Sequence, residues 1–119
     1  MGVAVGLGKP RFFVGKIDVY WVAGAILQSP AAWSPALRKF MVDTSNSYFI
    51  RRIARFAPMD VLVDFLIALG KKLREEGRES LVTFGLKGRK HAFYEKAGFE
   101  LVGYTKTGRP VYVLNLKNL

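Results

Sequence analysis

The sequence predicts one α+β domain with a mixed β-sheet, a long central helix and a short C-terminal helix. Three observations support this fold class. Segments rich in β-branched and aromatic residues occur towards both ends of the chain, one central segment repeats its apolar residues at helical spacing, and turn residues separate the segments. The length of 119 residues suits a single domain spanning 1–119, and an apolar content of 50% allows a buried core.

The N-terminal half is predicted to contain three strands. Residues 11–18 and 19–27 are rich in aromatic and β-branched residues and are expected to pair around 16–18. Pro30 ends the second of these strands. Residues 48–57 also have strand character, with side chains alternating between two faces, and a helix is the alternative for this segment.

The stretch between these strands, residues 31–46, carries weaker signals. Ser34 and Pro35 suit the N-cap and the first position of a short helix. Residues 43–47, Asp-Thr-Ser-Asn-Ser, have the composition of a turn. We therefore expect a short helix and a turn before the third strand.

The long central helix has the clearest signal. Pro58 suits its start, and Asp60 places a negative charge where the helix dipole favours one. Gly77 suits the left-handed residue that ends a helix. The apolar residues between them recur at helical spacing, at Leu62, Phe65, Leu66, Leu69 and Leu73.

The C-terminal part is predicted to add a strand, a short helix and a hairpin. The short buried strand is 81–84, the helix runs to Ala97 and stops at Gly98, and 100–106 and 109–116 form the hairpin around Thr107-Gly108. Strand–helix–strand steps imply parallel pairing and hairpins imply antiparallel pairing, so the sheet should be mixed.

The composition excludes several kinds of site. The chain has no cysteine, which excludes disulfides, thiolate metal sites and a cysteine nucleophile, and its one histidine gives little support for zinc. No apolar run reaches the roughly 18 residues of a membrane span, and the N-terminus lacks the basic start of a signal peptide. We expect a soluble cytoplasmic protein without a membrane partner.

The net charge of +10 is the strongest compositional signal. Two interpretations stay open. The charge serves solubility, or it attracts a polyanion, which would be DNA, RNA or a phosphate-rich cofactor such as coenzyme A.

The order of these elements, ending in Phe93-Tyr-Glu-Lys-Ala-Gly-Phe-Glu100, resembles the GNAT superfamily of N-acetyltransferases from its second strand onward. The resemblance covers about residues 11–116, and the first strand and helix of the usual fold are trimmed to about ten residues or lost. It implies an acyl-CoA-dependent N-acyltransferase that moves an acyl group from acetyl-CoA, or another acyl-CoA, to an amine. The alternative is an unrelated α+β domain in which Tyr94 and Phe99 are core aromatics.

The resemblance also implies where the cofactor would bind. In the superfamily, backbone N–H groups that lead into the long helix hold the pyrophosphate, in a segment Arg/Gln-x-x-Gly-x-Gly/Ala. The matching segment here is Arg52-Ile-Ala-Arg-Phe-Ala57, followed by Pro58, Met59 and Asp60. Ala57 fits, but Arg55 stands where glycine is expected and Pro58 has no N–H, so the side chains of Arg52 and Arg55 would have to supply charge that the backbone lacks.

Two further features belong to the implied site. Tyr94 matches the tyrosine that protonates the departing thiolate in many members, a task that suits a phenol with an ordinary pKa near 10. A buried core tyrosine would give the same sequence. Lys87, Arg89 and Lys90 form a basic loop that we expect near the cofactor, and His91 is predicted to be a surface histidine, with a base or phosphate contact as the alternative.

A narrower resemblance is to small phage-encoded GNAT-like proteins related to the Mom family, which modifies adenine in DNA. It rests on Gly24 to Pro30, Arg52-Ile-Ala-Arg55, Val82-Thr-Phe84 and the segment around Tyr94. The chain has Thr83-Phe-Gly-Leu86 where that pattern has an acidic residue, so the implied catalytic acid is missing. A basic, non-catalytic nucleic-acid-binding protein on the same fold is therefore the second functional class.

Overall fold

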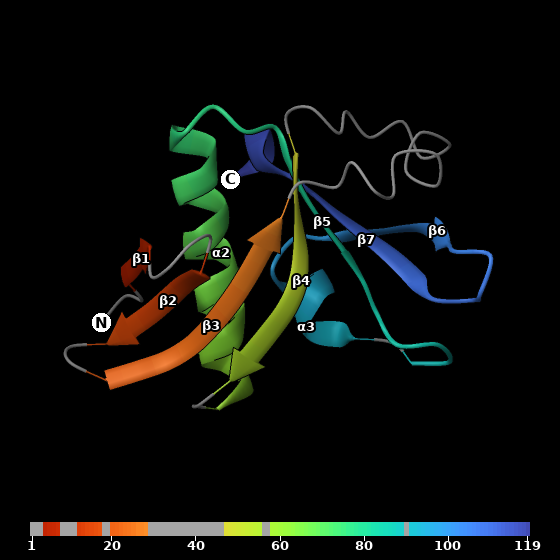
Figure 1. Ribbon diagram of the computed structural model, residues 1–119, viewed down its shortest axis with the longest axis horizontal. Helices are drawn as coiled ribbons and strands as arrows, with labels where there is room; N and C mark the ends of the chain where they lie inside the picture. Colours follow the sequence, from red (N-terminus) through yellow and green to blue (C-terminus); the bar gives the residue numbers. More distant parts are fainter. Residues whose placement is uncertain (1–3, 8–11, 18–19, 29–46, 56–57, 90) are drawn as a thin grey trace.

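The computed structural model describes residues 4–7, 12–17, 20–28, 47–55, 58–89 and 91–119. Figure 1 traces its strands and helices in chain order. They are β1 (Ala4–Leu7), β2 (Phe12–Ile17), β3 (Tyr20–Gln28), β4 (Ser47–Arg55), α2 (Met59–Glu75), β5 (Ser80–Phe84), α3 (Ala92–Lys96), β6 (Glu100–Tyr104), β7 (Pro110–Asn115) and the 3-10 turn η3 (Leu116–Asn118).

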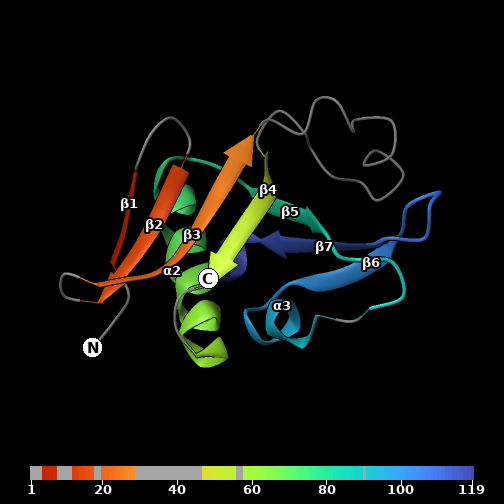
Figure 2. The same ribbon diagram turned by 60° about the horizontal axis from the view of Figure 1, so that its bottom comes forward.

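One mixed sheet runs through the molecule in the strand order β1-β2-β3-β4-β5-β7-β6. Neighbouring strands are antiparallel except β4 and β5, which are parallel because α2 connects them. Helices α2 and α3 cover one face of the sheet (Figures 1 and 2). The predicted α+β class with a mixed sheet is confirmed.

The N-terminal strands largely follow the prediction. β2 and β3 pair with Ile17 opposite Tyr20, and a register shift follows Gly15. The third predicted strand is β4, whose backbone excludes the helical alternative for this segment. The short helix expected at Ser34 and most of the turn at 43–47 lie outside the described residues.

One N-terminal strand was missed. Residues 4–7 form β1, which pairs with β2 from Ala4 opposite Lys16 to Leu7 opposite Phe13. A four-residue segment containing Gly6 has little strand preference of its own, so its structure depends on pairing with β2. The N-terminal strand is thus short rather than lost.

Helix α2 begins and ends as predicted. Its apolar stripe is buried against the sheet, and Leu62, Phe65, Leu66, Leu69 and Leu73 are all at most 4% exposed. At the C-terminal end Gly77 has a φ of 86°, its N–H donates to Arg74 O, and Arg78 N–H donates to Leu73 O. These two bonds satisfy carbonyls that the last helical turn would leave unpaired.

The parallel pairing predicted for the two strands that flank α3 is wrong. β6 does not pair with β5, because β7 lies between them and is antiparallel to both. β7 is buried on both faces over most of its length, whereas β6 is largely half-exposed. A strand with two apolar faces is favoured inside a sheet, and the more polar strand is left at the edge.

The core has two parts on opposite faces of the sheet. The larger lies under α2 and α3 and includes Phe65, Leu69 and Tyr94. The smaller, on the opposite face of β4, β5 and β7, is formed by Phe49, Val82 and Val111, with partly buried neighbours. None of the helices among the described residues is long and apolar enough to cross a membrane.

Candidate active site

The site begins where β4 and β5 separate. Their pairing covers three residue pairs, from Ser47–Ser80 to Phe49–Val82. β4 then continues to Arg55 paired with β3 but not with β5 (Figure 1). Thr83 Oγ1 still donates to Ile50 O across the gap at 3.4 Å. Beyond that contact, the edge of β4 that faces β5 is not paired with it, so its backbone groups can bond to a ligand.

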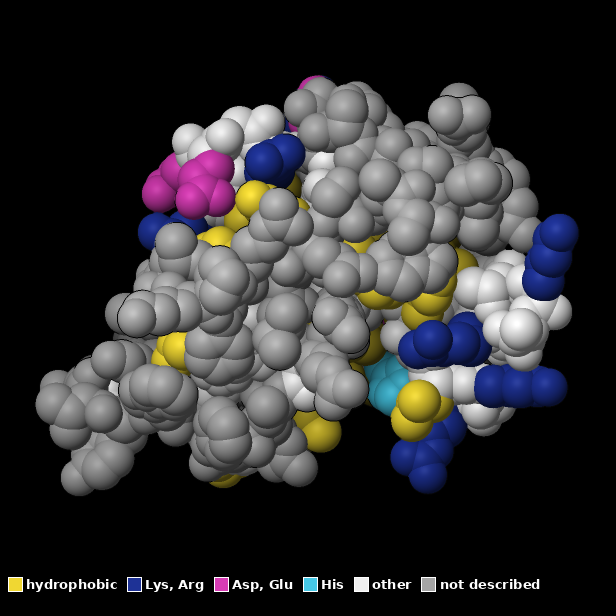
Figure 3. Space-filling view, in the orientation of Figure 1, with side chains coloured by type: hydrophobic (Ala, Val, Ile, Leu, Met, Phe, Trp, Pro, Cys, Tyr) yellow, Lys and Arg dark blue, Asp and Glu magenta, His cyan; other side chains and the backbone are white. Residues whose placement is uncertain are grey.

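A cavity of about 460 Å³ lies in this gap. Figure 3 shows the histidine beside a hollow with hydrophobic side chains in it and Lys and Arg side chains along one side. The volume falls in the range of small-molecule sites. The described residues that line it are Phe49, Ile50, Ile53, Thr83, Phe84, Gly85, Leu86, His91, Phe93, Tyr94 and Arg109.

Tyr94 lines the cavity from α3. The residue is 4% exposed, and its ring lies 5.2 Å from the ring centres of both Phe99 and Tyr112. Burial raises the pKa of the Tyr94 phenol, while a side-chain hydrogen bond with Thr83 acts in the opposite direction. Tyr94 is therefore protonated at neutral pH, and one polar partner is placed to stabilise its anion.

Gly85 holds His91 and β7 in close contact. A Cβ atom at Gly85 would lie 2.7 Å from His91 Cδ2 and 2.7 Å from Pro110 Cγ. The Gly85 N–H donates to Pro110 O at 2.8 Å, and the next N–H, of Leu86, donates to His91 Nε2 at 3.1 Å. Glycine is required here for space, because a side chain would displace His91 or the start of β7.

The bond from Leu86 fixes the state of the His91 ring. Because Nε2 accepts a hydrogen bond from a backbone N–H, it carries no proton, and the neutral ring holds its proton on Nδ1. Burial, and then the charge of Arg89, lower the pKa of His91. The half-buried ring lines the cavity and reaches the surface there (Figure 3), and it is a hydrogen-bond donor rather than a base.

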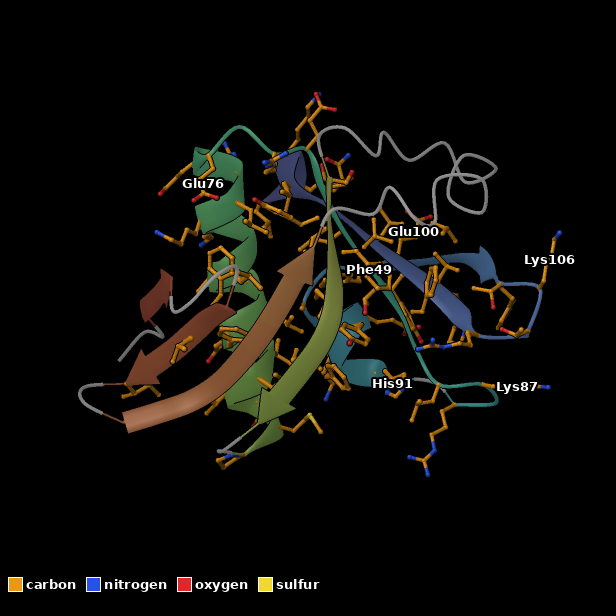
Figure 4. All side chains as sticks on the ribbon, viewed as in Figure 1. Phe49, Glu76, Lys87, His91, Glu100 and Lys106 are labelled. Carbon is orange, nitrogen blue, oxygen red and sulfur yellow. The ribbon has the colours of Figure 1, made fainter. Side chains whose placement is uncertain are left out.

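Arg109 lies at the same end of the cavity. Its Nε donates to Gly85 O at 2.9 Å and its Nη2 to Phe84 O at 3.5 Å. The guanidinium carbon lies 5.7 Å from the centre of the Phe84 ring. Figure 4 places His91 beside the cleft, with Lys87 and Lys106 pointing outwards from the two loops beyond it.

The structure brings only some of the predicted site residues to the cavity. Tyr94 lines the cavity, and the exposed Lys87 and Arg89 lie in the loop after β5, next to the lining residue Leu86. Met59 and Asp60 are exposed at the start of α2. Only the backbone of Arg52 and Arg55 is described, in β4, and Ala57 and Lys90 lie outside the described residues.

The start of α2 offers little to a phosphate. Pro58 has no N–H, and the Val61 N–H already donates to Pro58 O at 3.0 Å. The N–H groups of Met59 and Asp60 remain, beside the carboxylate of Asp60 in the first turn. The cleft therefore fits the acyl end of a coenzyme better than the helix start fits its pyrophosphate.

Three residues of the site were missed by sequence reasoning. Thr83 carries a signal, because it is the one polar residue in the apolar segment 81–84, which is mostly buried. Gly85 and Arg109 carry no such signal in the sequence. Their roles depend on contacts with residues from other parts of the chain, which only the structure shows.

Sequence comparison finds a viral protein that is similar to this chain. No protein-family model matches the chain. The chain is 42% identical over 95 residues to uncharacterized protein 154 of Sulfolobus islandicus rod-shaped virus 1, and the match spans 79% of this chain and 62% of the viral protein.

Solved structures resemble the chain at low sequence identity. A GNAT-family acetyltransferase from Listeria monocytogenes has a TM-score of 0.67 at 14% identity, with 88% of this chain and 64% of that one covered. AAC(6')-Ib, solved in complex with paromomycin and acetyl-CoA, has a TM-score of 0.63 at 19% identity, with 87% and 63% covered. The protein therefore has the fold of the GNAT acetyltransferases, as the sequence predicts.

Proposed function

We propose that this protein, which has the GNAT fold, binds an acyl-CoA in the cleft between β4 and β5 and transfers its acyl group to an amine. The observation that carries the proposal is Tyr94. It is a buried phenol on the wall of a cavity that Thr83 also lines, at the point where the two strands separate. The acetyl-CoA in the AAC(6')-Ib complex supports the choice of donor.

The residues of the cleft have distinct tasks in this reaction. A bound acyl-CoA would supply a thioester, whose carbonyl carbon bonds to the amine nitrogen as its carbon–sulfur bond breaks. Tyr94 gives its phenolic proton to the sulfur that leaves, and Thr83 stabilises the phenolate by turning its hydroxyl from Ile50 O towards Tyr94. The proton of the amine goes to solvent, because no Asp or Glu is among the described lining residues, and solvent returns one proton to the Tyr94 phenolate.

Several parts of the chain would hold the cofactor. The unpaired edge of β4 would bond to its extended arm, and Phe49, Ile53 and Phe93 would contact its apolar part. The N–H groups of Met59 and Asp60, with the side chains of Arg52 and Arg55 and the backbone at Ala57, would face the pyrophosphate. Lys87, Arg89 and Lys90 would add positive charge beside the cleft.

The Tyr94→Phe variant tests the proposal, since it keeps the ring and its packing and removes the proton donor. We expect acyl transfer to fall by about 10²–10⁴-fold while the fold is retained. The matched control is Tyr104→Phe, because Tyr104 is 54% exposed and does not line the cavity. Release of the coenzyme A thiol from acetyl-CoA, measured with a panel of amines, gives the rates.

Cofactor binding is measured separately. Calorimetry with acetyl-CoA should give similar affinities for the natural chain and Tyr94→Phe. Absence of binding to the natural chain would contradict the proposed donor, and full activity of Tyr94→Phe would leave Tyr94 a core residue.

A second function, nucleic-acid binding without catalysis, is favoured by one observation. The exposed bases Lys87, Arg89 and Arg109 lie on the cleft side of a chain with a net charge of +10. Binding of duplex DNA or RNA that weakens steeply with salt, in a protein that does not bind acetyl-CoA, would favour it. DNA base modification of the Mom type also remains a prediction. The similarity of the chain to a viral protein is compatible with it.

A further inference from the structure

Arg109 is fixed in place without being neutralised. Two backbone carbonyls, Gly85 O and Phe84 O, accept its Nε and Nη2 protons, and among the described residues no ion pair involves its guanidinium. Carbonyl oxygens orient a guanidinium but leave its full charge. No group in the described part of the chain accepts the protons on Nη1, so these can bond to a ligand.

Arg109 reaches the cleft from the face opposite the helices. Its guanidinium lies over Phe84, which packs with Phe49, Val82 and Val111 on that face. Tyr94 belongs to the other core, under α2 and α3. The two polar groups therefore enter one cavity from opposite sides, so a group that Arg109 binds can differ from the group that Tyr94 protonates.

We propose that the acceptor is a small amine that also carries a carboxylate or phosphate group, and that Arg109 binds this group. The inference rests on the proposed acyl transfer and names the acceptor class for the same site. A planar guanidinium held in one orientation recognises carboxylate and phosphate through paired, charge-assisted hydrogen bonds. A cavity of about 460 Å³ is the size of a small-molecule site, which favours a small amine over a polymer.

Matched amines test this inference on the natural chain. β-Alanine and n-propylamine differ by a carboxylate, and O-phosphoethanolamine and ethanolamine differ by a phosphate. With acetyl-CoA, we expect the anionic member of at least one pair to have a kcat/KM about 10- to 100-fold higher than its neutral partner, the range expected from hydrogen bonds to a charged group. Equal rates within both pairs would overturn the inference.

Two substitutions on the same hairpin separate Arg109 from general charge. Arg109→Gln should abolish the preference for the anionic amine, whereas Lys106→Gln, which also removes one positive charge, should keep it. Lys106 lies at the tip of the β6–β7 turn and does not line the cavity (Figure 4). The preference of the natural chain does not depend on either variant folding. A preference that persists in a folded Arg109→Gln protein would overturn the assignment.

A binding measurement distinguishes this inference from the acyl-transfer proposal. Calorimetry with O-phosphoethanolamine and ethanolamine needs no reaction, so it applies even if no amine is acylated. Binding of the phosphate compound alone, lost in Arg109→Gln and retained with saturating coenzyme A, supports an acceptor site. Displacement by coenzyme A would assign Arg109 to the phosphates of the cofactor. That result, like equal affinity for the two compounds or no binding of either anionic amine, would overturn the inference.

Discussion

At the residue scale, the backbone segment Phe84–Leu86 determines the chemistry of two side chains. Its carbonyls hold the guanidinium of Arg109, and its Leu86 N–H holds His91 in one tautomer. Gly85 provides the space that brings His91 this close. This segment has no titratable side chain, yet it holds both the charged Arg109 and the neutral His91 at the cleft.

His91 should make the stability of the protein depend on pH. Burial and Arg89 lower its pKa in the folded state, so below about pH 6.5 the unfolded chain binds more protons than the folded one. Stability should be full above pH 6.5 and should decrease as the pH falls from there towards the folded-state pKa. Chemical denaturation between pH 5 and 8 measures this, and His91 is the one histidine in the chain.

The control for that prediction is His91→Gln, because an amide oxygen can still accept the Leu86 N–H. The decrease below pH 6.5 should become shallower in this variant. An unchanged slope would mean that other groups titrate there and that His91 is not held neutral by its surroundings.

The sequence predicts the position of Tyr94 but little else of the site. The tyrosine lies within a continuous motif, so a local pattern is enough to place it near a cleft. Arg109 and Gly85 are 24 residues apart, and their contact exists because β7 pairs with β5. No local pattern contains that pairing, so neither the anchored cation nor the requirement for glycine could be predicted.

At the scale of elements, α2 stabilises the whole sheet through its apolar stripe. Leu69 belongs to this stripe and is fully buried. Leu69→Ala should lower the free energy of unfolding by about 2–5 kcal/mol, because it removes buried methyl groups and leaves a cavity. Thermal and urea unfolding measure the loss.

Lys71→Ala is the matched control, since Lys71 is exposed on the same helix and its loss should change stability by at most about 0.5 kcal/mol. Equal melting temperatures for Leu69→Ala and the natural chain would contradict the burial of this face.

Helical periodicity and turn residues were sufficient to predict α2 and the two hairpins, because these features are local. The insertion of β7 between β5 and β6 was not predictable from the order of elements alone. It follows from which strand has two apolar faces, as Val111 and Tyr112 on adjacent positions of β7 are both fully buried. Burial on both faces becomes visible only when all neighbours of the strand are known.

At the scale of the whole molecule, the described charges are unevenly distributed. Glu75, Glu76 and Glu79 lie at or just beyond the end of α2, interleaved with basic residues such as Lys72 and Arg74. Lys87, Arg89 and Arg109 lie on the cleft side. The basic residues attract anions towards the cleft, whereas basic neighbours offset the charge of the glutamates at the end of α2.

Charge reversal at Lys87 and Arg89 tests this field. The double variant Lys87→Glu, Arg89→Glu should weaken acetyl-CoA binding at low salt, and the difference should shrink as salt screens the charges. Lys71→Glu, on the outer side of α2, should have a much smaller effect. Calorimetry at two salt concentrations measures both. Because the double variant changes the net charge by twice as much, a loss half as large in Lys71→Glu would mean that net charge, rather than the position of the charges, determines binding.

The three residue pairs between β4 and β5 give a ligand a structural role. The sheet consists of two panels, β1–β4 and β5–β7, that hydrogen-bond to each other along this short seam while α2 covers one side. A molecule that bonds to both panels in the open part of the seam acts as a missing strand and completes the sheet. Binding of such a molecule should therefore raise the melting temperature. The size of this increase at a fixed ligand concentration would rank candidate donors and acceptors before any product has been identified.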